Sequence, residues 1–194
     1  YGDGCDLLIL RATDLVEKRR DQIGWKRFLN SKSPLDNYEK YITLKGEIEK
    51  EPPRRPPFDT SLPTLWRDRK SVLSLYGGKC KECGTAHFPL QRICFGCRSK
   101  DHFEEVRLVG KKAELFTFTK DNLFASIDPP MVMSVVEIEG GFRIYCQMTD
   151  RNPDQVKVGM PVEMTFRKIH EARGLNNYFW KCRPVRSEGG GKNG

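Results

Sequence analysis

Two CxxC pairs restrict how this chain can fold more than any other feature of its sequence. Cys80 and Cys83 form the first pair, and Cys94 and Cys97 form the second after a spacer of ten residues. Each CxxC turn brings two thiolates to one side of a metal, and the spacer is long enough for a hairpin that joins the two turns. Four thiolates match the tetrahedral coordination of zinc. The pattern therefore predicts a zinc ribbon.

The predicted zinc site is structural, because four protein ligands leave no open position for water or substrate. Iron in the same thiolate cage and a set of redox thiols are the alternative interpretations. His87 inside the hairpin and His102 just after it are the other candidate ligands, each in place of a cysteine. Gly78, Gly84 and Gly96 are expected to supply the positive-φ conformations that such turns often need.

The three remaining cysteines of the seven are scattered singly. Cys5, Cys146 and Cys182 are interpreted as small buried apolar residues. A nucleophilic cysteine needs a nearby base, and nothing in the sequence places His170 beside any of them. The segment itself is therefore expected to be non-catalytic. An odd cysteine count without a secretory signal predicts a reducing, cytoplasmic environment.

Composition and charge narrow the class of protein further. The 194 residues are 38% hydrophobic and 31% charged, which supports a modest core and excludes a wholly disordered chain. No apolar run approaches the ~20 residues of a membrane span. The net charge of +8 is spread along the chain without a dense basic run. Phosphate-containing ligands are plausible partners, whereas nucleic-acid binding is permitted but not required.

The first half of the chain is predicted to be a helical lead. Residues 1–10 are interpreted as a turn and a buried strand, residues 12–29 and 36–48 as helices, and residues 51–60 as a stiff proline-rich linker. A further helix is expected over residues 61–76, before the ribbon. The residues expected to face inward from the second helix are Tyr38, Tyr41, Ile42 and Leu44.

Residues 77–102 are assigned to the zinc ribbon, and residues 103–185 are predicted to be all-β. Turn signals such as Gly110, Gly140-Gly141 and Gly174 separate alternating segments rich in β-branched and aromatic residues. Five or six short strands with such turns favour a small barrel of the OB type. The expected strands are 103–109, 113–119, 131–138, 142–148, 162–167 and 178–184. Residues 186–194 are predicted to be a disordered tail.

The order of these parts resembles the acyl-CoA-associated zinc-ribbon/OB-fold family, catalogued as domain of unknown function family 35. The resemblance covers roughly residues 61–185 and combines the rubredoxin-like ribbon with landmarks in the barrel. The segments that carry it are Tyr76–Cys80, Cys83-Gly84, Phe88-Pro89, Cys94–Cys97, Gly110–Phe118, Pro129–Glu137 and Val158–Glu163.

The first fifty residues resemble a different family. Tyr1–Asp6 followed by the apolar Leu7–Leu10 is similar to the "GDGA" turn and strand near the end of hydroxymethylglutaryl-CoA synthases, which have the thiolase fold. The segment Asn37–Gly46 resembles the tyrosine-rich helix near the C-terminus of that group. The catalytic residues of such a synthase would lie before Tyr1, and none is carried over. Cys5 stands where alanine is usual in that turn.

The resemblance implies an accessory domain that handles acyl-CoA and docks onto a thiolase-fold enzyme, either in the same chain or in a separate one. Cations at a barrel rim would suit the phosphates of CoA, and an apolar groove would suit its pantetheine arm. The alternative is that the cations are solvated and the aromatic residues form the core. The rim candidates are Lys111, Lys112, Lys120, Arg143, Arg167 and Lys168. The groove candidates are Phe116, Phe118, Phe124, Phe179 and Trp180.

Three functions therefore remain open from the sequence. The favoured one is the acyl-CoA-handling and partner-docking domain of a thiolase-type enzyme. A single-stranded nucleic-acid module is the first alternative, because zinc ribbons and OB folds both occur in such proteins. A scaffold that bridges two enzymes without binding CoA is the second.

Overall fold

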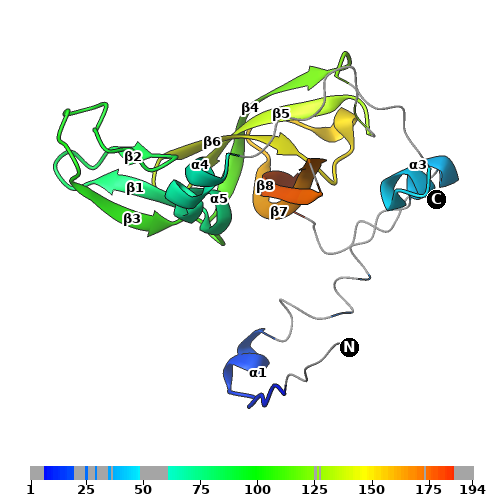
Figure 1. Ribbon diagram of the computed structural model, residues 1–194, viewed down its shortest axis with the longest axis horizontal. Coiled ribbons are helices and arrows are strands. Elements are labelled where there is room, and N and C mark those ends of the chain that lie inside the picture. Colours follow the sequence, from blue (N-terminus) through cyan, green and yellow to red (C-terminus); the bar gives the residue numbers. More distant parts are fainter. Residues whose placement is uncertain are drawn as a thin grey trace. The chain divides into compact units, whose positions relative to one another are not determined.

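The computed structural model describes residues 7–19, 25, 29, 35, 37–48, 61–124, 126, 128–172 and 174–185. The chain divides into two compact units, and the unit that spans Asn37–Val185 contains both the ribbon and the barrel (Figure 1). None of the helices in the described part of the chain has the length and apolar character needed to cross a membrane.

The zinc ribbon is built on a three-stranded antiparallel sheet in the order β2-β1-β3. Its strands are β1 (Tyr76–Cys80), β2 (Ala86–His87) and β3 (Phe103–Arg107). The segment 103–109 was expected to open the barrel, and this prediction is wrong, because β3 pairs with β1 along its whole length, from Tyr76 opposite Arg107 to Cys80 opposite Phe103. Alternating residues fit either sheet equally well. Closure of the ribbon brings residue 103 beside Cys80, and β3 therefore pairs with β1 instead of a barrel strand.

The second sheet is a closed five-stranded barrel in the order β4-β5-β6-β8-β7, which confirms the predicted OB-like barrel. Pairing of Ala113 with Val162 closes the barrel between β4 and β7, and β6 and β8 meet in parallel at Met148 and Cys182. The short 3-10 helix η1 (Pro153–Gln155) lies between β6 and β7. The barrel strands are β4 (Ala113–Asp121), β5 (Met131–Ile138), β6 (Phe142–Met148), β7 (Pro161–Ala172) and β8 (Leu175–Pro184).

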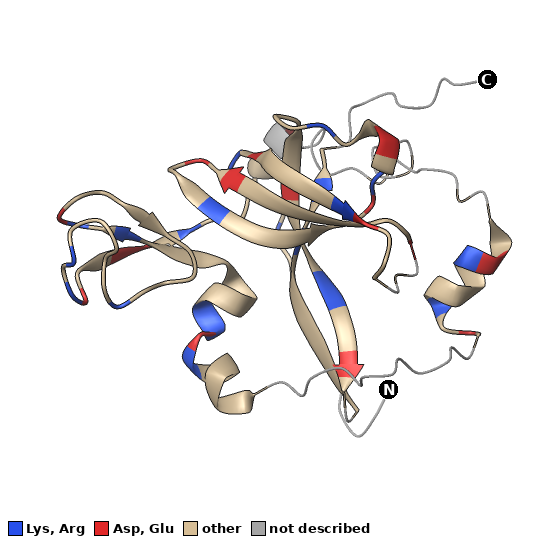
Figure 2. Cartoon of the chain, turned by 90° about the horizontal axis from the view of Figure 1, so that it is seen from above, with Lys and Arg blue, Asp and Glu red and all other residues tan. Residues whose placement is uncertain are grey.

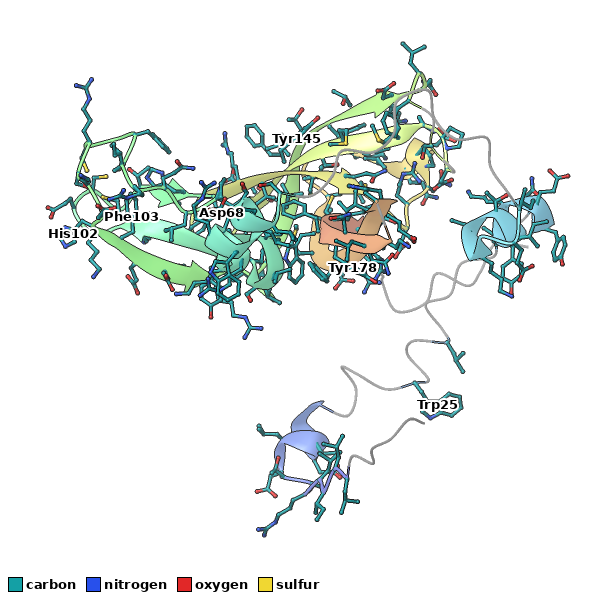
Figure 3. The ribbon with its side chains drawn as sticks, viewed as in Figure 1. Trp25, Asp68, His102, Phe103, Tyr145 and Tyr178 are labelled. Carbon is teal, nitrogen blue, oxygen red and sulfur yellow. The ribbon has the colours of Figure 1, made fainter. Side chains whose placement is uncertain are left out.

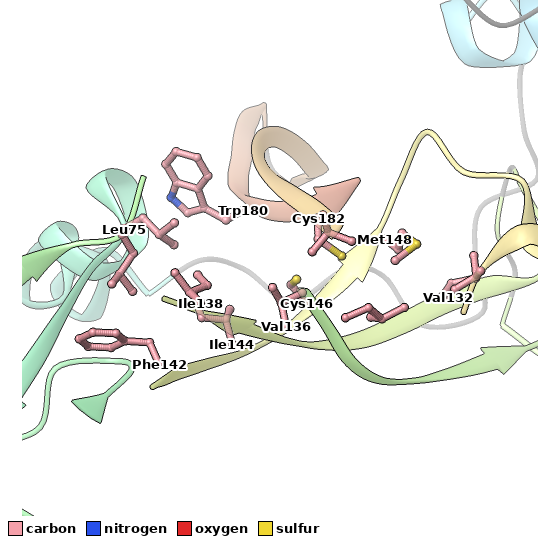
Figure 4. Close-up of a cluster of buried hydrophobic side chains, with 14 residues drawn as sticks. Leu75, Val132, Val136, Ile138, Phe142, Ile144, Cys146, Met148, Trp180 and Cys182 are labelled. Atoms are coloured by element: carbon pink, nitrogen blue, oxygen red, sulfur yellow. The ribbon is translucent and has the colours of Figure 1, made fainter. Parts of the chain in front are cut away.

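The barrel core comes from strict alternation along β5 and β6. Every second residue of β5, starting at Val132, and of β6, starting at Phe142, is buried. Figure 4 shows that this core continues toward the ribbon, where Leu75 lies near Phe142. Cys146 and Cys182 are buried in the same cluster, as predicted. Ribbon and barrel therefore share one hydrophobic core.

The helix expected over residues 61–76 is two helices, α4 (Leu62–Arg67) and α5 (Arg69–Ser74). They are separated at Asp68, whose φ of −99° and ψ of 13° lie outside the α-helical region. Asp68 is paired through both carboxylate oxygens with the guanidinium of Arg67 at 3.0 Å. Leu75 then adopts a left-handed φ of 53°, which ends α5 and leads the chain into β1.

The N-terminal predictions have mixed outcomes. Helix α1 (Leu15–Arg19) lies within the segment predicted to be helical, and α3 (Tyr38–Lys45) confirms the second helix, with Asn37 as its N-cap. Two predictions are wrong. Leu7–Leu10 form no strand and are exposed, and α3 buries none of its residues. The predicted turn at residues 1–6, the linker 51–60 and the tail 186–194 lie outside the described residues.

Candidate metal centre and charged surfaces

The four predicted cysteines come together at one end of the ribbon. Their sulfur atoms all lie within 4.8 Å of one another. Cys80 Sγ is 3.6 Å from Cys97 Sγ, and Cys83 Sγ is 3.5 Å from Cys94 Sγ. A tetrahedral site with Zn–S bonds of about 2.3 Å has sulfur–sulfur separations of about 3.8 Å. The geometry and the all-thiolate donor set therefore fit zinc.

Backbone turns fix the position of each pair of cysteines. The N–H of Cys80 donates to the carbonyl of Thr85, and the N–H of Gly84 donates to the carbonyl of Cys80, both at 2.9 Å. In the second turn the N–H of Cys94 donates to the carbonyl of Ser99, also at 2.9 Å. The two turns are alike, as expected for a ribbon in which two similar loops enclose one ion.

Hydroxyl groups lie close to three of the four sulfur atoms. Ser99 Oγ lies 3.2 Å from both Cys80 Sγ and Cys97 Sγ, and Thr85 Oγ1 lies 3.0 Å from Cys83 Sγ. The hydrogen bond from Ser99, followed by the backbone N–H of Cys83, lowers the pKa of Cys80 to about 6. A hydrogen bond from Thr85 likewise lowers the pKa of Cys83. Thiolates are the metal-binding form of cysteine, so the contacts at Cys80 and Cys83 favour metal binding by these two ligands.

Only one of the three ribbon glycines has the predicted positive φ. Gly84 has a φ of +72°, whereas Gly78 and Gly96 do not lie in that region. These two are required for space instead. A Cβ on Gly96 would lie 2.8 Å from Thr85 Oγ1, and a Cβ on Gly78 would collide with Leu90. The prediction of positive φ at Gly78 and Gly96 is therefore wrong: Gly78 lies within strand β1, and both glycines stand where a Cβ would meet a neighbouring side chain.

His87 supports the metal site without being one of its four ligands. Its side chain is buried, and Nε2 lies 3.4 Å from the sulfur of Cys94. Its ring packs between Phe95 and Phe103, with centroid separations of 4.5 and 5.0 Å. Burial lowers the pKa of His87. A neutral ring with its proton on Nε2 would donate a hydrogen bond to the Cys94 thiolate. The other candidate, His102, is exposed and contacts Glu82.

Replacing His87 by alanine should weaken zinc binding by roughly 10- to 100-fold, as removal of outer-shell groups commonly does. The His87→Gln variant retains an N–H donor and should lose less affinity. Competition with a chromophoric chelator measures both variants. Equal zinc affinity in the wild type and the His87→Ala variant would show that the contact with Cys94 has no role in metal binding.

The predicted rim cations do not converge on one site. Lys111 and Lys112 line a cavity of about 520 Å³ whose other lining residues include Glu114, Glu137, Glu139 and Glu163, an acidic setting for a phosphate. Arg143 donates to Glu137 at 2.9 Å and covers the ring of Phe116 at 3.7 Å. Arg167 pairs with Asp150, Lys168 pairs with Glu171, and Lys120 lies exposed on β4.

The predicted groove aromatics are also dispersed. Trp180 is buried in the core, and Phe118 is partly buried and packs against this core. Phe124 is exposed in the loop after β4. Phe116 lies beneath Arg143, and Phe179 is half-buried on β8. A role for these aromatics and for the rim cations in CoA binding therefore stays a prediction. Positive and negative residues are interspersed over the described surface, in agreement with the dispersed charge of the sequence (Figure 2).

A groove of about 900 Å³ separates α4–α5 from the ribbon. On the helix side it is lined by residues 67–71, and on the ribbon side by residues 89–93 together with Phe103. Ser71 Oγ donates to the carbonyl of Tyr76 at 2.9 Å, and Lys70 pairs with Glu105 at 2.7 Å, so the helices are held against the ribbon sheet.

Comparisons with known proteins agree with this architecture. The rubredoxin-like zinc ribbon domain of ChsH2 matches residues 67–102, and the C-terminal OB-fold domain of ChsH2 matches residues 105–167. A DUF35 domain-containing scaffold protein of Methanocaldococcus jannaschii is 38% identical over 125 residues, which are 62% of this chain and 88% of that protein. The chain belongs to the DUF35 family. A second DUF35 domain-containing scaffold protein, from Methanothermobacter thermautotrophicus, is 36% identical over 61% of this chain and 92% of its own length.

Among solved structures, the chain is similar to an Ltp2-ChsH2(DUF35) aldolase, with 20% identity, a TM-score of 0.49, and coverage of 67% of this chain and 98% of the other. The matched domains of this DUF35-family chain begin at residue 67 and therefore do not extend to residues 1–50, where the resemblance to a synthase was expected.

Proposed function

We propose that this DUF35-family chain is a zinc-stabilised scaffold that docks a thiolase-fold enzyme acting on acyl-CoA. Its relatives are described as scaffold proteins, and a closed tetrathiolate site supports structure rather than chemistry. The observation that carries the proposal is the exposed apolar surface beside the groove between α4–α5 and the ribbon.

We define the docking face by five exposed apolar residues: Leu62, Trp66 and Leu73 of the two helices, and Leu90 and Ile93, which line the ribbon side of the groove. Trp66, on α4, is 71% exposed, and Ile93, just before Cys94, is 60% exposed. The contact between Leu90 N and Ser71 Oγ, at 3.4 Å, joins the helical and ribbon parts. An apolar centre of this kind gains free energy when a partner removes it from water.

Charged pairs surround the docking face as a polar rim. Arg67 pairs with Asp68, Arg92 pairs with Asp101 at 2.7 Å, and the guanidinium of Arg69 lies 4.4 Å from the ring centre of Trp66. Protein interfaces typically combine an apolar centre with a polar rim, and tryptophan and arginine supply much of the binding energy. The composition of the docking face therefore fits a protein partner better than a small ligand.

Replacement of Trp66 by alanine should weaken enzyme binding by at least about 2 kcal/mol, roughly 30-fold in Kd, if it is an anchor residue. The matched control is Tyr145→Ala, because Tyr145 is a 66% exposed aromatic residue that projects from the barrel (Figure 3). Calorimetric titration with a thiolase or hydroxymethylglutaryl-CoA synthase measures the affinity. Loss of affinity in Tyr145→Ala alone would place the partner on the barrel and refute docking through the helices.

The acyl-CoA part of the proposal has a separate test. Acetyl-CoA should bind the complex of scaffold and enzyme more tightly than the enzyme alone if the barrel contributes contacts. Calorimetry with and without the scaffold compares the two affinities. Identical affinities would leave a scaffold that binds the enzyme without handling CoA.

We further propose, from the sequence resemblance alone, that residues 1–50 derive from the end of a synthase with the thiolase fold. A nucleophilic cysteine and a paired histidine encoded before Tyr1 would support this origin. Their absence from the sequence encoded upstream would remove the proposal without affecting the docking face.

A further inference from the structure

Three cations lie in a row on the outward side of the β7–β8 hairpin. Lys181 lies between Trp180 and Cys182, which are both buried in the core, so its own side chain is on the opposite face of the strand. Arg183 is two residues further along the same face. Arg167 is directly opposite Phe179, which puts it on this outward face as well.

The carboxylate of Asp150 contacts both arginines of this row. Asp150 Oδ2 lies 3.2 Å from Arg167 Nη2 and 3.6 Å from Arg183 Nη1. Arg183 also donates to Glu163 at 2.7 Å, so its charge has two acceptors. Lys181 lies between the two arginines in the register, yet none of the residues that the structure describes forms a hydrogen bond or an ion pair with its ammonium group.

A fourth cation adds to the positive charge near Lys181. Arg151 has a side chain that is only 3% exposed, and it binds the carboxylate of Asp128, which Lys40 also contacts. The Nε of Arg151 is buried and has no hydrogen-bond partner among the described residues. Lys181 itself is half-buried. Its burial lowers its pKa most, and the positive charges of Arg167 and Arg151 lower it further, whereas the negative charge of Asp150 raises it.

An ammonium group that is partly desolvated, has no hydrogen bond or ion pair among the described residues and feels the charge of two guanidinium groups is costly for the folded chain. A bound anion would remove this cost. Arg167 uses only its Nη2 toward Asp150, so among the described residues its other N–H groups have no acceptor. We propose that Lys181 and Arg167 bind a phosphate group on the outward face of the β7–β8 hairpin.

Phosphate suits this site because its three oxygens can accept from an ammonium and a guanidinium together, with the charge shared between them. The phosphate could be borne by CoA, and that identification alone rests on the proposed function. Free phosphate or pyrophosphate is the other source. The site itself requires only the cations on the hairpin, and its test is independent of enzyme docking.

The Lys181→Met variant, which lacks the amine, tests whether the ammonium group of Lys181 destabilises the folded state. Because the folded-state pKa of Lys181 is lowered, the protonated amine destabilises the folded state below that pKa. This cost declines as the pH rises toward the ordinary pKa of lysine, which is about 10.4. The variant should therefore melt no lower than the wild type at pH 7 without added anions.

The decisive experiment titrates the 194-residue chain with pyrophosphate, CoA and phosphate-free pantetheine by calorimetry at low salt. We expect pyrophosphate to bind the wild type, and Lys181→Met to bind at least 10-fold more weakly. The control is Lys157→Met, because Lys157 is an exposed lysine between η1 and β7, outside the β7–β8 hairpin. This control should bind pyrophosphate as the wild type does. Pyrophosphate should also protect Lys181 from acetylation in a mass-spectrometric assay.

The possible outcomes distinguish the existence of the phosphate site from the identity of the molecule that carries the phosphate. Binding of pyrophosphate and CoA, but not of pantetheine, supports a phosphate site used by CoA. Binding of pyrophosphate alone supports the site and removes CoA as its ligand. No binding, or equal loss of binding in the Lys181→Met and Lys157→Met variants, overturns the inference. None of these results depends on whether an enzyme binds the docking face.

Discussion

The Cys94→Ser variant is expected to lose its zinc and to lose the ordered ribbon while the barrel stays folded. Cys94 is fully buried and contributes one of the four sulfurs. Structural zinc contributes about 10–16 kcal/mol of apparent binding free energy, which is folding free energy for the domain that holds it. The ribbon sheet has only three short strands, so it cannot replace this contribution with packing.

Metal analysis and amide hydrogen exchange test this expectation together. The wild type should contain one equivalent of zinc, and the Cys94→Ser variant should contain less than half an equivalent. Amides of β1 and β3 should exchange rapidly in the variant, whereas those of β5 and β6 should stay protected. Cys146→Ala is the control, because Cys146 is a buried thiol outside the metal cluster. Full zinc content in the Cys94→Ser variant would exclude the four-cysteine site.

The Phe142→Ala variant should lower the free energy of unfolding by about 3–5 kcal/mol, the usual cost of removing a buried aromatic side chain. Phe142 is 1% exposed and begins β6 at the junction of barrel and ribbon. Its ring touches the backbone of β1 so closely that a Cβ on Gly77 would lie 2.7 Å from Phe142 Cε1. Gly77, which faces the ring from β1, has no side chain that could fill the resulting cavity.

Urea unfolding measures this loss, and Tyr145→Ala on the same strand is the matched control. Tyr145 is 66% exposed, so its removal should change stability by no more than about 0.5 kcal/mol. A Phe142→Ala variant as stable as its control would show that ribbon and barrel do not share a core.

The strands of the barrel could be predicted from local sequence because their alternation is strong. Met131–Ile138 and Phe142–Met148 were predicted at their observed limits, since both have one buried face and are bounded by turn residues. The partner of residues 103–107 could not be predicted in this way. Their alternation is compatible with either sheet, and the metal-closed ribbon supplies the neighbouring strand.

Helix ends and N-terminal segments were less predictable for a physical reason. Asp68 interrupts the apolar helix pattern through its backbone conformation and its pairing with Arg67, neither of which alters the spacing of Leu65 and Trp66. Apolar composition at Leu7–Leu10 predicted a strand, but a strand also needs a neighbour, and no described strand pairs with this segment.

The metal ligands followed from sequence because their spacing is itself the chemical signal. His87 required the structure, since its contact with Cys94 forms only when β2 pairs with β1. Lys181 was also missed. Its position between Trp180 and Cys182 indicates an outward direction, but the nearby Asp150 and Arg151 come from the loop after β6. Such convergence of distant segments has no local signature in the sequence.

Hydrogen exchange of the chain with and without a thiolase-fold enzyme tests the docking proposal most directly. The proposal predicts slower exchange over residues 61–75 and 88–95, which contain the docking face, with little change along β5 and β6. Unchanged exchange throughout the chain at saturating enzyme, or protection confined to the barrel, would contradict docking through this face.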